Sequence, residues 1–209
     1  MPYPTPILVR GINNLSDARY CAGMGVDKLS FVLDPALPGH LPTAAVKELA
    51  GWVAGVELIG EFGELSAPEI NALATECALD AVLLRGLRSA DELADIAPPV
   101  FIEISLEELH QETDLGSIAP AIAGLVVELP EHLDFTADAA AVDNALAQLN
   151  ELADQTPLWL GPGLNPTRAR QVVDSLPLSG LVFASGHEIK PGLRDFDQLE
   201  AVFEALETE

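Results

Sequence analysis

The sequence is poor in cysteine, in basic residues and in long apolar runs. Only Cys21 and Cys77 occur among its 209 residues, which argues against a disulfide framework and fits a reducing compartment. No apolar run approaches the roughly eighteen residues of a membrane span, and the N-terminus has no basic segment followed by an apolar one. We therefore expect a soluble, cytoplasmic protein with no membrane partner.

Basic residues are scarce relative to acidic ones. The chain has 10 lysines and arginines against 33 aspartates and glutamates, which gives a formal net charge of -23. Such a field repels nucleic acid phosphates, so nucleic acid is excluded as a partner, and an anion could bind only where arginines or backbone amides face it. The excess of carboxylates also raises the hypothesis of a salt-tolerant source.

Short apolar segments alternate with helical patterns along the whole chain. Strands are expected to begin near residues 7, 28, 56, 80, 99, 123, 157 and 180, and each is followed by a helix-forming stretch. This alternation predicts parallel strands joined by right-handed crossovers, in either an open doubly wound sheet or a closed barrel. Eight units without a long linker favour an α/β protein made of a single (β/α)8 TIM barrel over residues 1–209.

Local signals place several helix boundaries. Asn14 or Ser16 could cap the first helix, and Ser66 and Ser89 begin the third and fourth. The fifth helix, between residues 106 and 118, has the weakest pattern. Trp52 and Trp159 are expected to pack between helices and sheet.

Two glycine-bearing turns follow the last two predicted strands. Gly163 and Leu164 lie in the first turn, and Ser185 and Gly186 lie in the second. Glycine allows backbone amides to approach an oxyanion closely, and the start of a helix adds partial positive charge. The loops after strands seven and eight of a TIM barrel commonly bind phosphate. We call these four residues the phosphate cup and expect a small phosphorylated metabolite as the ligand.

These motifs resemble the phosphoribosylanthranilate isomerase family over nearly the whole chain. Residues 8–12 and 14–18 are similar to the family's first strand and helix, and residues 80–86 to its fourth strand. The most specific similarity lies in the two phosphate loops, at residues 163–166 and at residues 185–188 with 191–195.

The resemblance implies an Amadori rearrangement of a phosphoribosyl amine without a cofactor. It places the family's general base, a cysteine, at Arg10, and its general acid, an aspartate, at Glu128. Arginine stays protonated, so Arg10 cannot abstract a proton. The family's glutamine and histidine at the end of the fourth strand correspond to Leu83 and Arg85 in this sequence. The family's substrate-binding loop arginine falls at about Gly39.

Strand alternation points Arg10, Arg85 and Glu128 inward at the carboxyl ends of their strands. They could form a buried ion-pair network, or they could build a new pocket in which arginines bind a second anion and Glu128 transfers protons. Three functions therefore remain open: residual isomerase activity, another reaction on a phosphorylated metabolite with Arg85 as a substrate-binding residue, and binding without catalysis. His110 and His132 lack partners at metal-ligand spacing, so we expect no metal site. A monomer and a homodimer are both compatible with the sequence.

Overall fold

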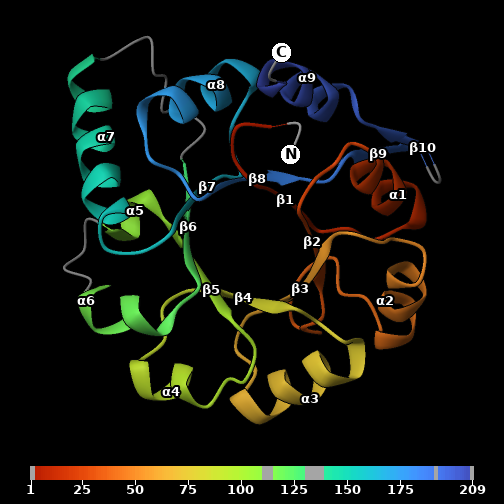
Figure 1. The fold of residues 1–209 in the computed structure, drawn as a ribbon. Coiled ribbons are helices and arrows are strands. Elements are labelled where there is room, and N and C mark those ends of the chain that lie inside the picture. Colours follow the sequence, from red (N-terminus) through yellow and green to blue (C-terminus); the bar gives the residue numbers. More distant parts are fainter. Residues whose placement is uncertain (1–2, 110–114, 130–138, 191–192, 208–209) are drawn as a thin grey trace.

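A computed structural model describes residues 3–109, 115–129, 139–190 and 193–207. Eight parallel strands close into a barrel, and helices surround it (Figure 1). Strand β1 pairs with both β2 and β8, which completes the ring and confirms the predicted TIM barrel. The strands are β1 Ile7–Arg10, β2 Lys28–Val32, β3 Glu57–Phe62, β4 Ala81–Arg85, β5 Val100–Ser105, β6 Gly124–Glu128, β7 Leu158–Leu160 and β8 Gly180–Ala184.

Helices follow the strands in the predicted order. Their bounds are α1 Leu15–Gly23, α2 Thr43–Ala50, α3 Ala67–Cys77, α4 Ala90–Ala94, α5 Leu106–Leu109, α6 Leu115–Ile118, α7 Ala139–Ala153, α8 Pro166–Ser175 and α9 Asp197–Leu206, with a 3₁₀ turn at Ala119–Ala121. The fifth unit, which had the weakest helical pattern, holds two four-residue helices on either side of residues 110–114, which lie outside the described residues.

Polar side chains begin several of these helices. The Asn14 side chain accepts a hydrogen bond of 2.9 Å from the Asp17 amide, so Asn14 rather than Ser16 caps α1. Ser89 and Glu92 form the predicted capping box of α4. Each such cap satisfies amides that have no partner inside the helix.

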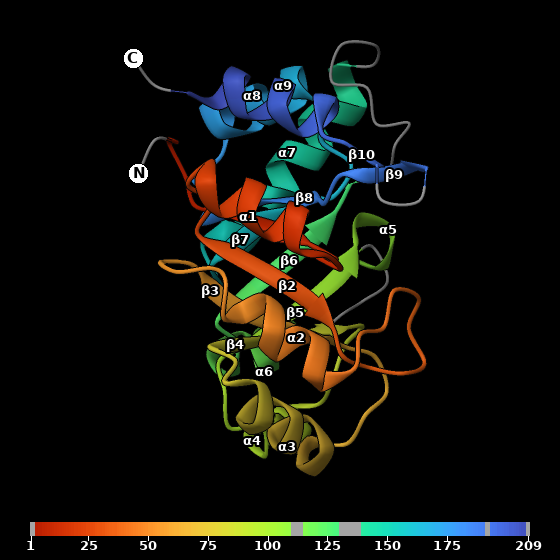
Figure 2. The ribbon, with the colours of Figure 1, turned by 90° about the vertical axis from the view of Figure 1, so that its right-hand side faces the viewer.

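An antiparallel hairpin after β8 was not predicted from the sequence. Its strands are β9 His187–Lys190 and β10 Leu193–Asp195. Residues 191 and 192, which contributed to the family resemblance, lie outside the described residues. The hairpin stands at the end of the barrel toward which the strands run (Figure 2). It therefore belongs to the face where active sites of TIM barrels are built.

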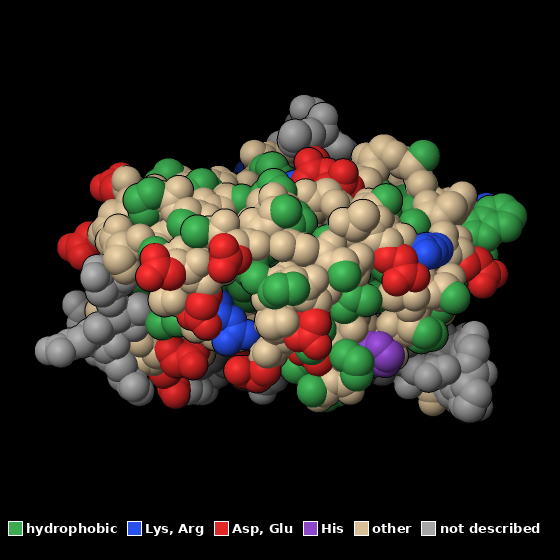
Figure 3. All heavy atoms as spheres, turned by 90° about the horizontal axis from the view of Figure 1, so that it is seen from below, with side chains coloured by type: hydrophobic (Ala, Val, Ile, Leu, Met, Phe, Trp, Pro, Cys, Tyr) green, Lys and Arg blue, Asp and Glu red, His purple; other side chains and the backbone are tan. Residues whose placement is uncertain are grey.

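Acidic side chains are spread over the outer surface. On the face shown in Figure 3, Asp and Glu side chains are numerous and Lys and Arg side chains are few, as the composition implies. None of the helices in the described part of the chain has the length and apolarity required to cross a bilayer.

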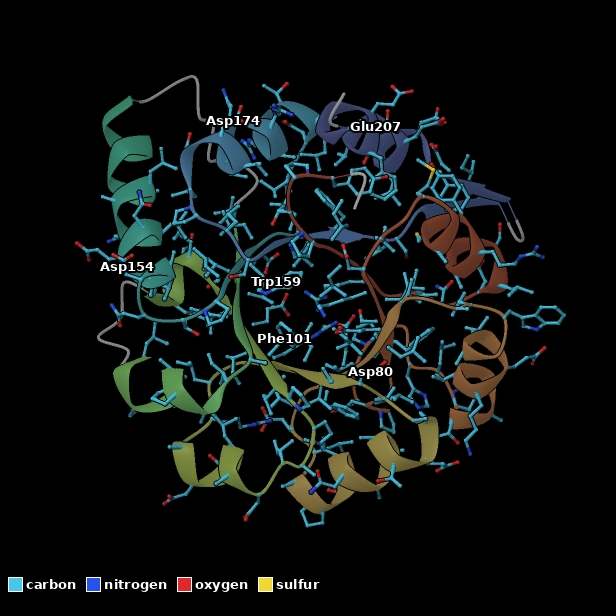
Figure 4. All side chains as sticks on the ribbon, in the orientation of Figure 1. Asp80, Phe101, Asp154, Trp159, Asp174 and Glu207 are labelled. Carbon is cyan, nitrogen blue, oxygen red and sulfur yellow. The ribbon has the colours of Figure 1, made fainter. Side chains whose placement is uncertain are left out.

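The barrel interior is a separate apolar cluster inside the ring of strands. It contains Leu8, Ile59, Ala81, Leu83, Phe101, Val126, Trp159 and Val182. The rings of Phe101 and Trp159 pack edge to face within this interior, and their centroids are 5.6 Å apart (Figure 4). The prediction that Trp159 packs between helix and sheet is therefore wrong, because its strand directs the indole inward. Trp52 is 62% exposed, so the same prediction is wrong for this residue too.

Candidate active site at the barrel mouth

Four charged residues form a network across the top of the barrel interior. They are Arg10, Glu61, Arg85 and Glu103, near the carboxyl ends of β1, β3, β4 and β5, and we call them the arginine–glutamate layer. The Arg10 guanidinium bonds Glu61 Oε2 at 2.6 Å and also bonds Glu103. In a ring of eight strands β1 and β5 are opposite each other. Arg10 therefore spans the barrel from one wall to the other.

Glu61 is the most connected member of this layer. Its side chain is 1% exposed, and it accepts hydrogen bonds from Ser30 Oγ at 2.6 Å and from Arg85 Nη2 at 2.9 Å. Burial by itself would raise the pKa of Glu61. The charge and hydrogen bonds of Arg10, Ser30 and Arg85 outweigh burial and lower this pKa to about 2. Glu61 is therefore an anion at neutral pH.

These contacts make Arg10 a structural cation. It is 8% exposed and its charge is matched by two carboxylates. The position that carries the general base in the resembling family therefore holds a protonated group fixed in an ion pair. The prediction of a buried ion-pair network agrees with these contacts, and it accounts for Arg10 and Arg85 but not for Glu128.

Glu128 ends β6 outside the network. Its backbone lies opposite Ser105 of β5, and the residue is exposed. It lines two cavities at the mouth, one of about 1030 Å³ and one of about 400 Å³. Both cavities also border Pro162, Ala184 and Ser185, so they adjoin each other. Glu128 is thus placed to reach a ligand that extends from one cavity into the other.

All four residues of the phosphate cup line the larger cavity. The Ser185 amide donates to the Arg10 carbonyl at 2.9 Å and its hydroxyl to the Gly11 carbonyl at 3.2 Å, so the protein itself uses both donors. Within the described residues, the amides of Gly163 and Leu164 donate to no protein group. These two amides are therefore available to a ligand.

The helix beside the cup adds further groups. Asn165 caps α8 by accepting from the Arg168 amide at 2.9 Å. The Arg168 side chain also lines the larger cavity, and its Nη1 lies 3.5 Å from the Gly163 carbonyl oxygen. Sequence reasoning did not assign Arg168, although its place in the first turn of the helix after the cup was a usable signal.

The smaller cavity lies above the arginine–glutamate layer. Arg10, Arg85, Glu61 and Glu103 line it together with Gly39. Glu61 lies two residues after Ile59, and Glu103 lies two residues after Phe101. Strand alternation with the buried Ile59 and Phe101 shows that both point inward. Among the described residues, no group of three or more His, Cys, Asp or Glu side chains is arranged to hold a metal ion.

Comparisons with known proteins agree with the fold. No protein-family model matches the chain. An N-(5'-phosphoribosyl)anthranilate isomerase from Synechococcus sp. (strain JA-2-3B'a(2-13)) is 29% identical over 96% of this chain and 89% of its own. The same isomerase from Geobacter sulfurreducens is 28% identical over 90% of this chain and 92% of its own.

Solved structures show the same fold. The phosphoribosyl anthranilate isomerase of Thermotoga maritima superimposes with a TM-score of 0.79 at 19% identity, over 97% of this chain and 98% of that one. A structure of phosphoribosyl anthranilate isomerase in complex with reduced 1-(o-carboxyphenylamino)-1-deoxyribulose 5-phosphate gives a TM-score of 0.78 at 19% identity, over 97% of this chain and 98% of that one. The chain is therefore similar to phosphoribosylanthranilate isomerases in sequence and in fold over nearly its whole length.

Proposed function

We propose that the protein binds a phosphorylated sugar amine across the two cavities and catalyses its Amadori-type isomerisation, with Glu128 as the proton-transfer residue. The observation that carries this proposal is the position of Glu128, which lines both the cavity of the phosphate cup and the cavity above the arginine–glutamate layer. The relatives support the reaction class, since their name describes isomerisation of an N-(5'-phosphoribosyl) amine.

The phosphate is assigned to the amides of Gly163 and Leu164. Both residues line the larger cavity at the start of α8, where aligned peptide dipoles favour an anion. The sugar then extends toward Glu128. Arg168, beside the cup, supplies a positive charge at the phosphate end.

Glu128 can serve both proton transfers of the rearrangement. As a carboxylic acid it donates a proton to the ring oxygen, and the C1–O bond breaks to give an open-chain iminium ion. The carboxylate that is left then accepts the proton from C2, which forms the enolamine, and tautomerisation gives the ketose amine. Arg10 takes no part as a base because it remains protonated.

A turnover assay tests this proposal. N-(5'-phosphoribosyl)aniline and N-(5'-phosphoribosyl)anthranilate are incubated with the protein, and the loss of aldose amine is followed by chromatography. We expect turnover of at least one of them, reduced by about a hundredfold or more in Glu128→Gln. Glu76→Gln, on the exposed face of α3, is the matched control and leaves the rate unchanged. Turnover that survives Glu128→Gln would contradict the assignment of Glu128.

A second candidate is ligand binding without catalysis. The arginine–glutamate layer favours it, because Arg10 fills the position of the family's base with a cation held by Glu61 and Glu103. In that case calorimetry detects binding of ribose 5-phosphate, Gly163→Ala weakens it, and neither amine is turned over. An added Cβ at Gly163 would meet the Leu129 carbonyl and deform the cup, whereas Gly23→Ala, in α1, serves as the control.

A further inference from the structure

Among the described residues, acidic side chains outnumber basic ones around the two cavities. Of the lining that the structure describes, three arginines and five carboxylates other than Glu128 leave an excess of two negative charges even when Glu128 is protonated; these residues are Arg10, Arg85 and Arg168, and Glu61, Glu103, Glu107, Asp195 and Asp197. The excess lies in the pocket itself and is part of the net charge of -23 of the whole chain. It bears directly on which phosphate esters can enter.

The two arginines above the barrel interior are already matched by carboxylates. Arg10 bonds Glu61 and Glu103, and Arg85 bonds Glu61 at 2.9 Å with its Nε 3.9 Å from Glu103. The layer therefore has no net charge, although the Arg85 side chain is 36% exposed. A carboxylate on the ligand would compete with Glu61 and Glu103 for these guanidinium groups. Arg85 thus has little attraction for a second anion, in contrast to the pocket with two anion-binding arginines considered from the sequence.

Within the described parts of the chain, the carboxylates that line the larger cavity outnumber the arginines that line it. Glu107, Glu128 and Asp197 are exposed, and Asp195 is half-buried with its Oδ1 accepting from the Asp197 amide at 2.9 Å. Carboxylate oxygens accept hydrogen bonds from hydroxyl and ammonium groups, and they repel another carboxylate. The arginine of the larger cavity, Arg168, lies at the phosphate end beside Gly163.

We infer that the ligand of this site is a phosphate ester whose other end carries hydroxyl or amine donors and no carboxylate. The inference rests on the proposed function, because it concerns the ligand of the same two cavities. It separates this protein from its relatives, whose name specifies anthranilate, an aromatic carboxylate. The same carboxylates also weaken binding of the phosphate, so inorganic phosphate alone is expected to bind poorly.

A matched pair of ligands tests the inference. Sorbitol 6-phosphate and 6-phosphogluconate differ chiefly at the end far from the phosphate, where one has a hydroxymethyl group and the other a carboxylate. We expect calorimetry at low salt to show that sorbitol 6-phosphate binds about tenfold more tightly or better. Equal binding, or tighter binding of 6-phosphogluconate, overturns the inference while leaving phosphate-ester binding intact. Binding of neither compound overturns both the inference and the proposed function.

Variants of the acidic lining show whether the discrimination comes from this site. In the double variant Glu107→Gln and Glu128→Gln, the preference for sorbitol 6-phosphate should fall to about threefold or less, because neutral amides replace two carboxyl groups of the lining. Glu76→Gln, which removes one charge far from the cavities, should leave the preference unchanged. An unchanged preference in the double variant overturns the assignment to these carboxylates.

Discussion

At the scale of single residues, Glu61 joins the polar and charged side chains at the top of the barrel interior. It contacts Arg10, Arg85 and Ser30, and its pKa is lowered to about 2 because these partners outweigh the effect of burial. An ordinary glutamate in the unfolded chain has a pKa near about 4.3. The lower folded value means that ionised Glu61 stabilises the fold above the unfolded pKa. This contribution is lost as the pH falls toward the folded value.

Replacement of Glu61 tests this linkage. At about pH 7 we expect Glu61→Gln to lower the free energy of unfolding by on the order of 3 kcal/mol, since Arg10 and Arg85 lose a buried counter-charge. The difference from the wild type should shrink as the pH falls below about 4.5, because Glu61 in the unfolded wild type then takes up a proton. Urea unfolding at several pH values measures it, with Glu48→Gln on α2 as the control. A difference that stays constant with pH would refute the linkage.

At the scale of elements, two strands carry glycine where the barrel interior holds its largest rings. A Cβ at Gly180 of β8 would overlap the benzo ring of Trp159, and one at Gly124 of β6 would press on both Phe101 and Trp159. Neither glycine has a positive φ, so space and not backbone conformation requires them. The inward direction of Trp159 on β7 and these small residues on its neighbours belong to one packing arrangement.

The substitution Gly180→Ala should therefore destabilise the barrel. We expect a loss of about 1 to 3 kcal/mol in the free energy of unfolding, since the rings must move to admit the methyl group. Gly23→Ala is the matched control, because no other group lies within 4 Å of the place that its new methyl would occupy, and alanine favours the helix. Chemical denaturation of both variants measures the effect. Equal stability of the two variants would show that the interior has room for the extra carbon.

At the scale of the whole molecule, electrostatic repulsion opposes the compact state. The net charge of -23 is carried by a single barrel, and acidic side chains are more numerous than basic ones on the face seen in Figure 3. The 33 carboxylates therefore far outnumber the 10 lysines and arginines that could pair with them. Salt screens such repulsion, with a Debye length that falls from about 10 Å at 0.1 M to about 3 Å at 1 M.

Added salt should stabilise the protein. We expect the melting temperature to rise by about 5 °C or more between roughly 0.1 M and 1 M KCl, because repulsion in the folded state is screened. Thermal unfolding followed by circular dichroism measures the change, and the same series with an uncharged osmolyte separates screening from preferential exclusion. A melting temperature that is unchanged or lower in KCl would contradict both this expectation and the hypothesis of a salt-tolerant source.

Much of the architecture follows from the sequence. Alternating apolar and helical segments determined eight strand–helix units, because parallel strands buried on both faces must be continuous and apolar. Asn14, Ser66 and Ser89 were recognisable as helix caps because capping is a local interaction. The cup was also visible, since glycine-bearing turns after the last two strands have a known place in a closed barrel.

Other features were decided only by the tertiary structure. The pairing of Arg10 with Glu103 joins opposite walls of the barrel, and no local pattern connects residues on β1 and β5. The inward direction of Trp159 depended on which face of β7 meets the ring interior, and a three-residue strand is too short to reveal its alternation. Which amides of the cup remain available for a ligand depended on hydrogen bonds between Ser185 and the end of β1. Composition and periodicity report local preferences, whereas these contacts arise only when distant strands close into a ring.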